Sequence, residues 1–161
     1  MDEILEILEK DARLTPKEIA AMLSLDEKEI EKKIAAYEEQ GIILGYKTVI
    51  NKELLGVAHD KVRALIEVKV VPEKDVGFDN IAKRIYFFDE VKSCFLVSGD
   101  YDLLLIVEGD DIHTVAGFVA EKLSPMENVR GTRTHFLLKK YKEDGIVLIG
   151  KDDVKRMPIS Y

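Results

Sequence analysis

Four consecutive residues near the middle of the chain, Gly-Asp-Tyr-Asp at positions 99–102, combine groups that suit a small charged ligand. They lie between two apolar segments, 91–98 and 103–108, so the pattern predicts two strands joined by a polar turn. The glycine can leave backbone N–H donors open, and the carboxylates and the phenol add acceptors. A zwitterion offers a carboxylate to the donors and an ammonium to the carboxylates. The residues therefore indicate either a zwitterion-binding turn or an ordinary polar turn.

Three hydroxyl groups could join this turn if the sheet brings them near it. Ser98 directly precedes the turn, and Thr132 and Thr134 lie on a later predicted strand. Solvated strand positions are the alternative for all three. The candidate effector-binding residues are Ser98, Gly99, Asp100, Tyr101, Asp102, Thr132 and Thr134.

Lysines on a predicted helix provide a second candidate chemistry, phosphate binding. Ile30, Ile34 and Tyr37 recur at helical spacing and form its predicted buried stripe. Lys28 and Lys32 then point the other way, where DNA would lie against a recognition helix. A packing or dimerising module without DNA contact is the alternative. The candidate DNA-contacting residues are Thr15, Lys17, Lys28, Lys32, Lys33, Tyr46 and Lys47.

The distribution of charge weighs against strong DNA binding. Residues 1–60 hold eight Lys or Arg and fourteen Asp or Glu, a net charge of −6, whereas residues 61–161 hold sixteen and seventeen, a net charge of −1. Affinity for DNA depends heavily on neutralising phosphates. A metabolite-binding oligomer whose head has lost affinity for DNA is therefore the main rival interpretation.

Other chemistries find little support in the sequence. His59, His113 and His135 are widely separated and lack metal-ligand spacing, and Cys94 lies within an apolar run, where a packing role is expected. The glycine patterns of nucleotide-binding loops and the nucleophile elbow are absent. We expect no catalytic centre, no metal and no cofactor.

The elements that position the lysines are short helices. Apolar residues recur at helical spacing from position 4, and Thr-Pro-Lys-Glu at 15–18 predicts a second helix with a capping box. Asp26 predicts the start of a third helix, which Gly41 would end. Two short helices separated by about three or four residues form a helix-turn-helix. Residues 42–44 and 46–50, on either side of Gly45, predict a short β-hairpin, or wing.

The elements that position the polar turn follow a different pattern, with strand and helix signals alternating. The predicted order is a strand over 63–70, a helix over 78–85, strands over 91–98 and 103–108, a helix that Asp110 or Asp111 caps and Ser124-Pro125 ends, and a strand over 130–139. This β-α-β-β-α-β order is the ferredoxin-like pattern, a sheet with two helices on one face. Residues 146–149 could add a short strand.

The expected fold class is α+β, a winged helix-turn-helix followed by a ferredoxin-like domain. The expected limits are 1–50 for the head with its wing, 51–61 for a linker, 62–149 for the second domain and 150–161 for a tail. The chain has 161 residues, a net charge of −7 and one cysteine. Because no apolar run approaches about 18 residues and the N-terminus is acidic, we expect a cytoplasmic protein without a membrane segment.

Taken in this order, the segments resemble the Lrp/AsnC family of feast/famine regulators up to about residue 149. The segments that carry the resemblance are ILEILEKDARLTPKEIAAMLSL, EEQGIILGYKTVIN, VKSCFLVSGDYDLLLIVEG and TRTHFLLKKYKEDGI. The resemblance implies a RAM- or ACT-like second domain that forms homodimers, which assemble into tetramers or octamers. It also implies an amino acid or related metabolite bound between dimers around 99–102, in a site that the segment with Thr132 and Thr134 commonly completes. Family members often carry arginines in the recognition helix, whereas residues 26–33 contain none.

The resemblance therefore implies a DNA-binding transcriptional regulator that responds to an amino acid or related metabolite and is not an enzyme. Its implied partners are double-stranded DNA, the effector and further copies of itself. Two alternatives stay open: the metabolite-binding oligomer with weak or lost DNA binding, and a decarboxylase acting on sirohaem. The decarboxylase should need histidine and arginine groups around a large pocket, and this chain has few of either.

Overall fold

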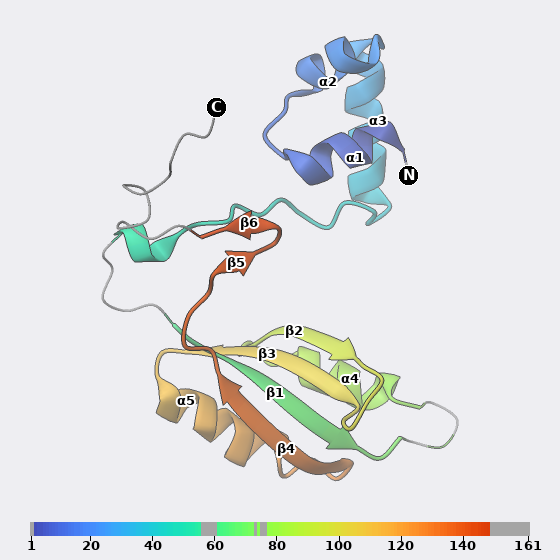
Figure 1. Cartoon of the computed structure of the whole chain (residues 1–161). Coiled ribbons are helices and arrows are strands. Elements are labelled where there is room, and N and C mark those ends of the chain that lie inside the picture. The colour runs from blue at the N-terminus through green and yellow to red at the C-terminus, as the bar shows by residue number, and fades with distance from the viewer. Residues whose placement is uncertain (1, 56–60, 73, 75–76, 149–161) are drawn as a thin grey trace. The chain divides into compact units, whose positions relative to one another are not determined.

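The chain, seen here as a computed structural model, divides into two compact units, of which the first ends at Ile50 and the second begins at Asn51 (Figure 1). The structure describes residues 2–55, 61–72, 74 and 77–148. The expected linker at 51–61 therefore lies partly outside the described residues, and the expected tail at 150–161 lies wholly outside them.

The first unit consists of three helices, α1 (Glu3–Lys10), α2 (Pro16–Leu23) and α3 (Glu27–Glu39). All three helices contribute apolar side chains to one core. The buried members of this core are Ile4, Leu8, Ile19, Ala20 and Ile30. Since burial of an isoleucine or leucine side chain stabilises the fold by about 1.5–3 kcal/mol, the packing of the three short helices depends on this core.

Local capping sets the limits of α2 and α3. The Glu18 backbone N–H donates to the Thr15 hydroxyl at 3.3 Å, and the Thr15 backbone N–H donates to the Glu18 carboxylate at 2.8 Å. This reciprocal pair is the predicted capping box. Ser24 then ends α2 in the left-handed region with φ of 55°, and Asp26 caps α3 by accepting from the backbone N–H of Lys28 at 2.9 Å. The predicted helix-turn-helix is confirmed.

The structure has no strand in residues 42–50, so the hairpin predicted after α3 is not observed. The backbone N–H groups of Ile42 and Ile43 instead donate to the Tyr37 carbonyl, at 2.8 and 3.1 Å, which extends the end of α3. The physical reason is the single residue, Gly45, between the two predicted segments. A tight hairpin needs two central residues, and two short strands alone are only marginally stable.

The second unit contains a four-stranded antiparallel sheet in the order β2-β3-β1-β4. A short 3-10 helix, η1 (Lys52–Leu55), precedes the sheet. The elements that follow are β1 (Val62–Val70), α4 (Asp79–Tyr86), β2 (Val91–Leu96), β3 (Leu103–Gly109), α5 (Ile112–Gly117), its π-helical continuation η2 (Phe118–Leu123) and β4 (Val129–Phe136). The predicted β-α-β-β-α-β order is confirmed, with the last strand ending at Phe136 rather than at residue 139.

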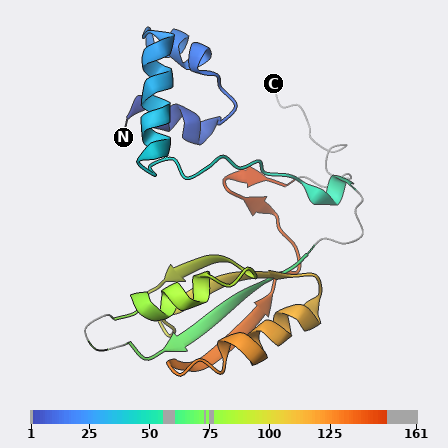
Figure 2. The same ribbon diagram turned by 180° about the vertical axis from the view of Figure 1, so that it is seen from behind.

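One face of the sheet carries both helices, α4 and α5 (Figure 2). Alternate residues of β1 and β3 point into the layer between sheet and helices and are buried there. The helices contribute Ile81, Ile85, Val115 and Phe118 to the same core. Asp111 rather than Asp110 caps α5, because its carboxylate accepts from the backbone N–H of Thr114 at 2.7 Å.

The opposite face of the sheet is covered by no described helix of the second unit and is partly apolar. The register pairs Leu65 with Ile106 and Phe95 with Leu104, so these four side chains share that face. Three of them are half-buried, and Phe95 is 49% exposed. Within the second unit, the face therefore exposes apolar surface that neither of its described helices, α4 and α5, covers.

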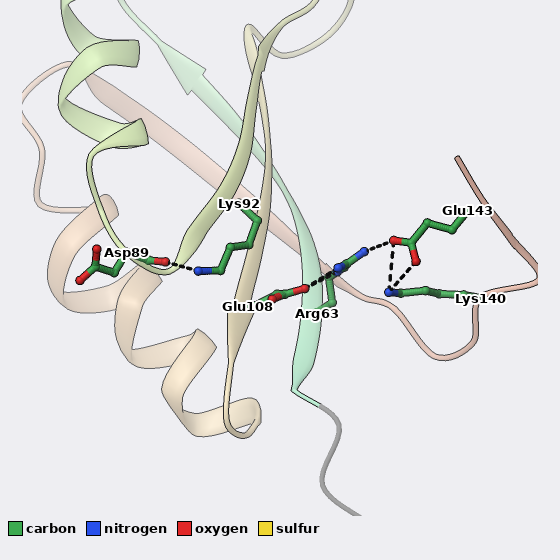
Figure 3. Close-up of polar contacts among 6 residues, drawn as sticks. All are labelled: Arg63, Asp89, Lys92, Glu108, Lys140 and Glu143. Atoms are coloured by element: carbon green, nitrogen blue, oxygen red, sulfur yellow. Dashed lines mark hydrogen bonds and ion pairs between the residues drawn. The ribbon is translucent and has the colours of Figure 1, made fainter. Parts of the chain in front are cut away.

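A small hairpin, β5 (Lys142–Glu143) and β6 (Ile146–Val147), follows the sheet. Arg63 on β1 joins it to the sheet, because its guanidinium donates to Glu108 on β3, with Nε at 2.7 Å, and to Glu143 on β5 (Figure 3). The Lys140 ammonium also donates to Glu143, at 3.2 Å. The hydrogen bonds from Arg63, and secondarily from Lys140, hold the pKa of Glu143 below its usual range.

This lowered pKa predicts a pH-dependent part of the stability. A carboxylate whose pKa falls on folding stabilises the fold above its unfolded pKa and loses that contribution as the pH falls through the folded value. We therefore expect Glu143→Gln to lower the melting temperature at neutral pH. The difference from wild type should shrink below the ordinary glutamate pKa of about 4.3.

Thermal melts of both proteins between neutral and acid pH would measure this. Glu127→Gln is the matched control, because Glu127 is exposed and belongs to no ion pair among the described residues. An equal deficit for Glu143→Gln at every pH would contradict the prediction.

Candidate functional site

Helix α3 turns two lysines toward solvent on the face opposite its buried residue. Ile30 is fully buried, whereas Lys28 and Lys32, one helical turn apart, are both exposed. Within the described part of the chain neither ammonium forms an ion pair. The two charges are thus available to an external anion.

Carboxylates share this exposed surface with the lysines. Glu27, Glu29 and Glu31 are also exposed, and none of them pairs with Lys28 or Lys32 in the described residues. The surface of α3 therefore has mixed charge, as the net charge of −6 over residues 1–60 predicts. A phosphate group at this surface would be attracted by the lysines and repelled by the carboxylates beside them.

Three other candidate DNA-contacting residues already have partners within the head. The Thr15 hydroxyl donates to Glu18 at 2.7 Å as part of the capping box. The Lys33 ammonium lies 3.9 Å from the Asp2 carboxylate. The Tyr46 hydroxyl donates to Glu38 at 2.9 Å, and partial burial with this bond raises the pKa of Tyr46. Lys17 and Lys47 are exposed.

Asp2 is a structural residue that the sequence did not identify. Its carboxylate accepts from the backbone N–H of Ile4 at 2.9 Å and also from the Tyr37 hydroxyl, and these bonds lower its pKa. Tyr37 was predicted to be buried, but it is half-buried and its hydroxyl reaches Asp2 at the start of α1. An acidic residue just before an apolar helical repeat is the signal that could have indicated this cap.

The polar turn at 98–102 connects β2 to β3 at the C-terminal end of β1. Its last residue, Asp102, is held by β1, because its carboxylate accepts from the Val70 backbone N–H at 2.8 Å and its own N–H donates to the Val68 carbonyl at 3.1 Å. Asp102 therefore positions the turn. Ser98 and Asp100 are exposed, and Tyr101 is half-buried.

The two candidate threonines lie on the other side of β1 from this turn. Thr132 pairs with Val68, and Thr134 pairs with Ile66, so both belong to β4. Two strand spacings separate β4 from β3, roughly 10 Å. The structure thus brings residues 98–102 together and leaves Thr132 and Thr134 apart from them within one chain.

Two family descriptions match the two units. Residues 3–43 match the winged helix-turn-helix DNA-binding domain, and residues 63–147 match the Lrp/AsnC ligand-binding domain. The chain belongs to the Lrp/AsnC family. It is a transcriptional regulator with a DNA-binding head and a ligand-binding domain, and the expected α+β fold class is confirmed.

Relatives match over nearly the whole chain. The chain is 43% identical over 158 residues to the HTH-type transcriptional regulator YugG of Bacillus subtilis, covering 98% of this chain and 95% of that protein. It is 31% identical to the HTH-type transcriptional regulator LrpA of Pyrococcus horikoshii, covering 86% and 94%.

Solved structures of the same architecture include a complex with an amino acid. The transcriptional regulator of Neisseria meningitidis bound to L-methionine is 26% identical, covers 87% of this chain and 88% of its own, and has a TM-score of 0.65. The fold is also that of Escherichia coli AsnC, at 23% identity and a TM-score of 0.65 over 87% of this chain and 91% of that one.

Two features are absent from the described residues. No group of three or more His, Cys, Asp or Glu side chains in them could hold a metal ion. None of the described helices is long and apolar enough to cross a membrane.

Cys94 is half-buried against the core of the second unit, and this burial raises the pKa of its thiol.

The backbone of the turn predicts the effect of a substitution at Gly99. Its φ of +153° lies in a region that L side chains rarely adopt. We expect Gly99→Ala to lower the free energy of unfolding by about 1–3 kcal/mol through backbone strain. Urea denaturation would measure the loss.

Gly131→Ala on β4 is the matched control, because a Cβ there meets no atom within 4 Å and no strained φ is required. It should leave the stability unchanged or slightly raised. Equal losses for the two variants would contradict the strain interpretation.

Proposed function

We propose that this regulator acts as a homodimer that contacts duplex DNA through α3 of each head and responds to an amino acid bound at the 98–102 turn. The observation that carries the DNA contact is the exposed pair Lys28 and Lys32, opposite buried Ile30. Heads related by a two-fold axis can present paired recognition helices to successive major grooves.

Among the candidate DNA contacts, we give the leading roles to Lys28, Lys32 and Lys17. Thr15 and Lys33 would have to exchange partners within the head for phosphate oxygens, so their contributions are secondary. The net charge of −6 over residues 1–60 supports only modest binding by a single head. Pairing of two heads compensates for this weakness.

A second copy of the chain is the occupant that we propose for the open face of the sheet. Leu65, Leu104, Ile106 and Phe95 give this face an apolar centre, which a two-fold related sheet would cover. Dimers formed in this way would assemble further, into tetramers or octamers. The resemblance of the sequence to its family supports this step.

The effector site that we propose combines two protomers. Ser98, Gly99, Asp100 and Tyr101 offer donors and acceptors on one protomer, and Asp102 holds their turn in place. Thr132 and Thr134 would join from a neighbouring protomer, because in one chain β1 lies between them and the turn. The methionine complex of the Neisseria relative supports an amino acid as the ligand.

We further propose a cytoplasmic protein without catalytic activity or a cofactor other than this effector. The acidic head specifically favours one rival function, a metabolite-binding oligomer with little affinity for DNA. The two functions differ in whether the lysines of α3 matter for DNA binding.

Charge reversal on α3 tests the DNA contact. We expect the wild-type protein to retard DNA from upstream of its own gene at low salt, and Lys28→Glu with Lys32→Glu to abolish this shift, because two phosphate contacts become repulsive. Effector binding should survive. The matched control is Lys83→Glu with Lys92→Glu, which changes the charge equally in the second unit. Failure of the wild-type protein to shift this DNA, with or without amino acids, would contradict the proposal and favour the rival.

A thermal-shift screen with the twenty amino acids tests the effector site. A ligand at 100 times its Kd adds about 2.7 kcal/mol to the stability of the state that binds it. We expect at least one amino acid to raise the melting temperature, and Asp100→Asn to reduce that rise by removing a carboxylate for the ammonium. Asp89→Asn, at an exposed position before β2, is the control. A full response from Asp100→Asn would exclude Asp100 from the site.

A further inference from the structure

A basic and aromatic surface lies on the segment that leads into the C-terminal hairpin. Lys139, Tyr141 and Lys142 are exposed there, Tyr141 to 72%. We propose that these three residues, which we call the hairpin patch, form a second contact to the phosphate backbone of DNA, separate from the helix-turn-helix. This inference rests on the DNA binding proposed above.

The side chains of this segment divide into an anchored one and solvent-facing ones. Lys140 is only 27% exposed and turns toward Glu143, which Arg63 also binds (Figure 3). The Lys139 ammonium lies 5.1 Å from the centre of the Tyr141 ring. Within the described residues, neither Lys139 nor Lys142 pairs with a carboxylate. Two of the three lysines therefore remain available to an external anion.

Glu143, which follows Lys142 in the sequence, does little to oppose this positive charge. Glu143 is bound by both Arg63 and Lys140, so its charge is already compensated. Lys61 and Lys122 of the second unit, in contrast, have carboxylate partners. Lys61 lies 3.7 Å from Asp110, and Lys122 pairs with Glu90. The hairpin patch thus concentrates uncompensated positive charge.

The hairpin also has a defined shape before any ligand arrives. Asp144 and Gly145 connect β5 to β6 with φ of 47° and 80°, the positive values that a tight type I′ turn requires. The Leu148 N–H donates to the Tyr141 carbonyl at 2.9 Å, and Arg63 joins β5 to the sheet. Since binding costs less when the bound shape is already formed, this anchoring favours the hairpin patch as a contact surface.

Duplex DNA is the occupant that the charges favour. A regulator whose first 60 residues carry a net charge of −6 must obtain phosphate neutralisation from elsewhere if it is to hold DNA tightly. Lysines bind phosphates as point charges, and a tyrosine hydroxyl can donate to a phosphate oxygen. Such contacts carry no sequence information, so the hairpin patch would add affinity and leave sequence choice to α3.

The test is Lys139→Gln with Lys142→Gln in the full chain, with Lys83→Gln and Lys92→Gln as the matched control. Fluorescence anisotropy with duplex DNA over a series of salt concentrations would give the affinity and its salt dependence. We expect several-fold weaker binding and a salt slope lower by about 2 per protomer in contact, since each lost phosphate contact removes about 1. The control pair should leave both unchanged, and Lys139→Arg with Lys142→Arg should keep wild-type binding.

Several results would overturn the inference. One is an unchanged affinity and an unchanged salt slope in the Lys139→Gln, Lys142→Gln variant. If the α3 charge reversal still abolishes DNA binding, the proposed function stands and only the hairpin patch is excluded. A second is weakened binding in the Arg pair, which would exclude a role of charge. A third is dissociation of the oligomer by the Gln pair, measured by sedimentation, because lost assembly would then explain lost affinity. Absence of DNA binding by the wild-type protein would overturn the inference and the proposed function together.

Discussion

Strand β1 is paired along both edges, with β3 and with β4, and the alternation of its side chains decides both faces of the sheet. Ala64, Ile66 and Val68 are fully buried in the core shared with α4 and α5. Because successive side chains point to opposite faces, Arg63 and Glu67 must face away from the helices. A slip of one residue would bury these charges and expose the core, so the register is strongly constrained.

Both elements of the second unit for which we propose binding roles are held by this strand. At one end, the Val70 N–H donates to Asp102 and holds the turn that precedes β3. At the other end, Arg63 binds Glu108 and Glu143 and holds the hairpin. Each attachment consists of a charged or polar group bound to the most constrained strand of the unit. The register of β1 therefore fixes the positions of the polar turn at 98–102 and of the basic hairpin.

The head illustrates a conflict between helix stability and DNA affinity. Asp26 caps α3, and Glu27 and Glu29 lie in its first turn, where negative charge interacts favourably with the helix dipole. The same carboxylates repel phosphates beside Lys28 and Lys32. The acidic residues therefore stabilise α3 but lower its affinity for DNA. A second basic surface on the hairpin would restore attraction without changing the caps of α3.

Local signals in the sequence were sufficient for the helices, for the order of the strands in the second unit and for the residues that make up the turn. Thr15 and Glu18 specify the start of α2 because a capping box acts over three residues, and period-two alternation specifies β1. Such local signals do not specify which strands pair or which side chains far apart in the sequence come into contact. Only the tertiary structure decided that Asp102 binds the Val70 backbone and that β1 separates Thr132 from the turn, since strand order joins residues far apart in the chain. The absence of strands from residues 42–50 shows a second limit, because the single Gly45 between the two predicted segments does not supply the two central residues of a tight hairpin.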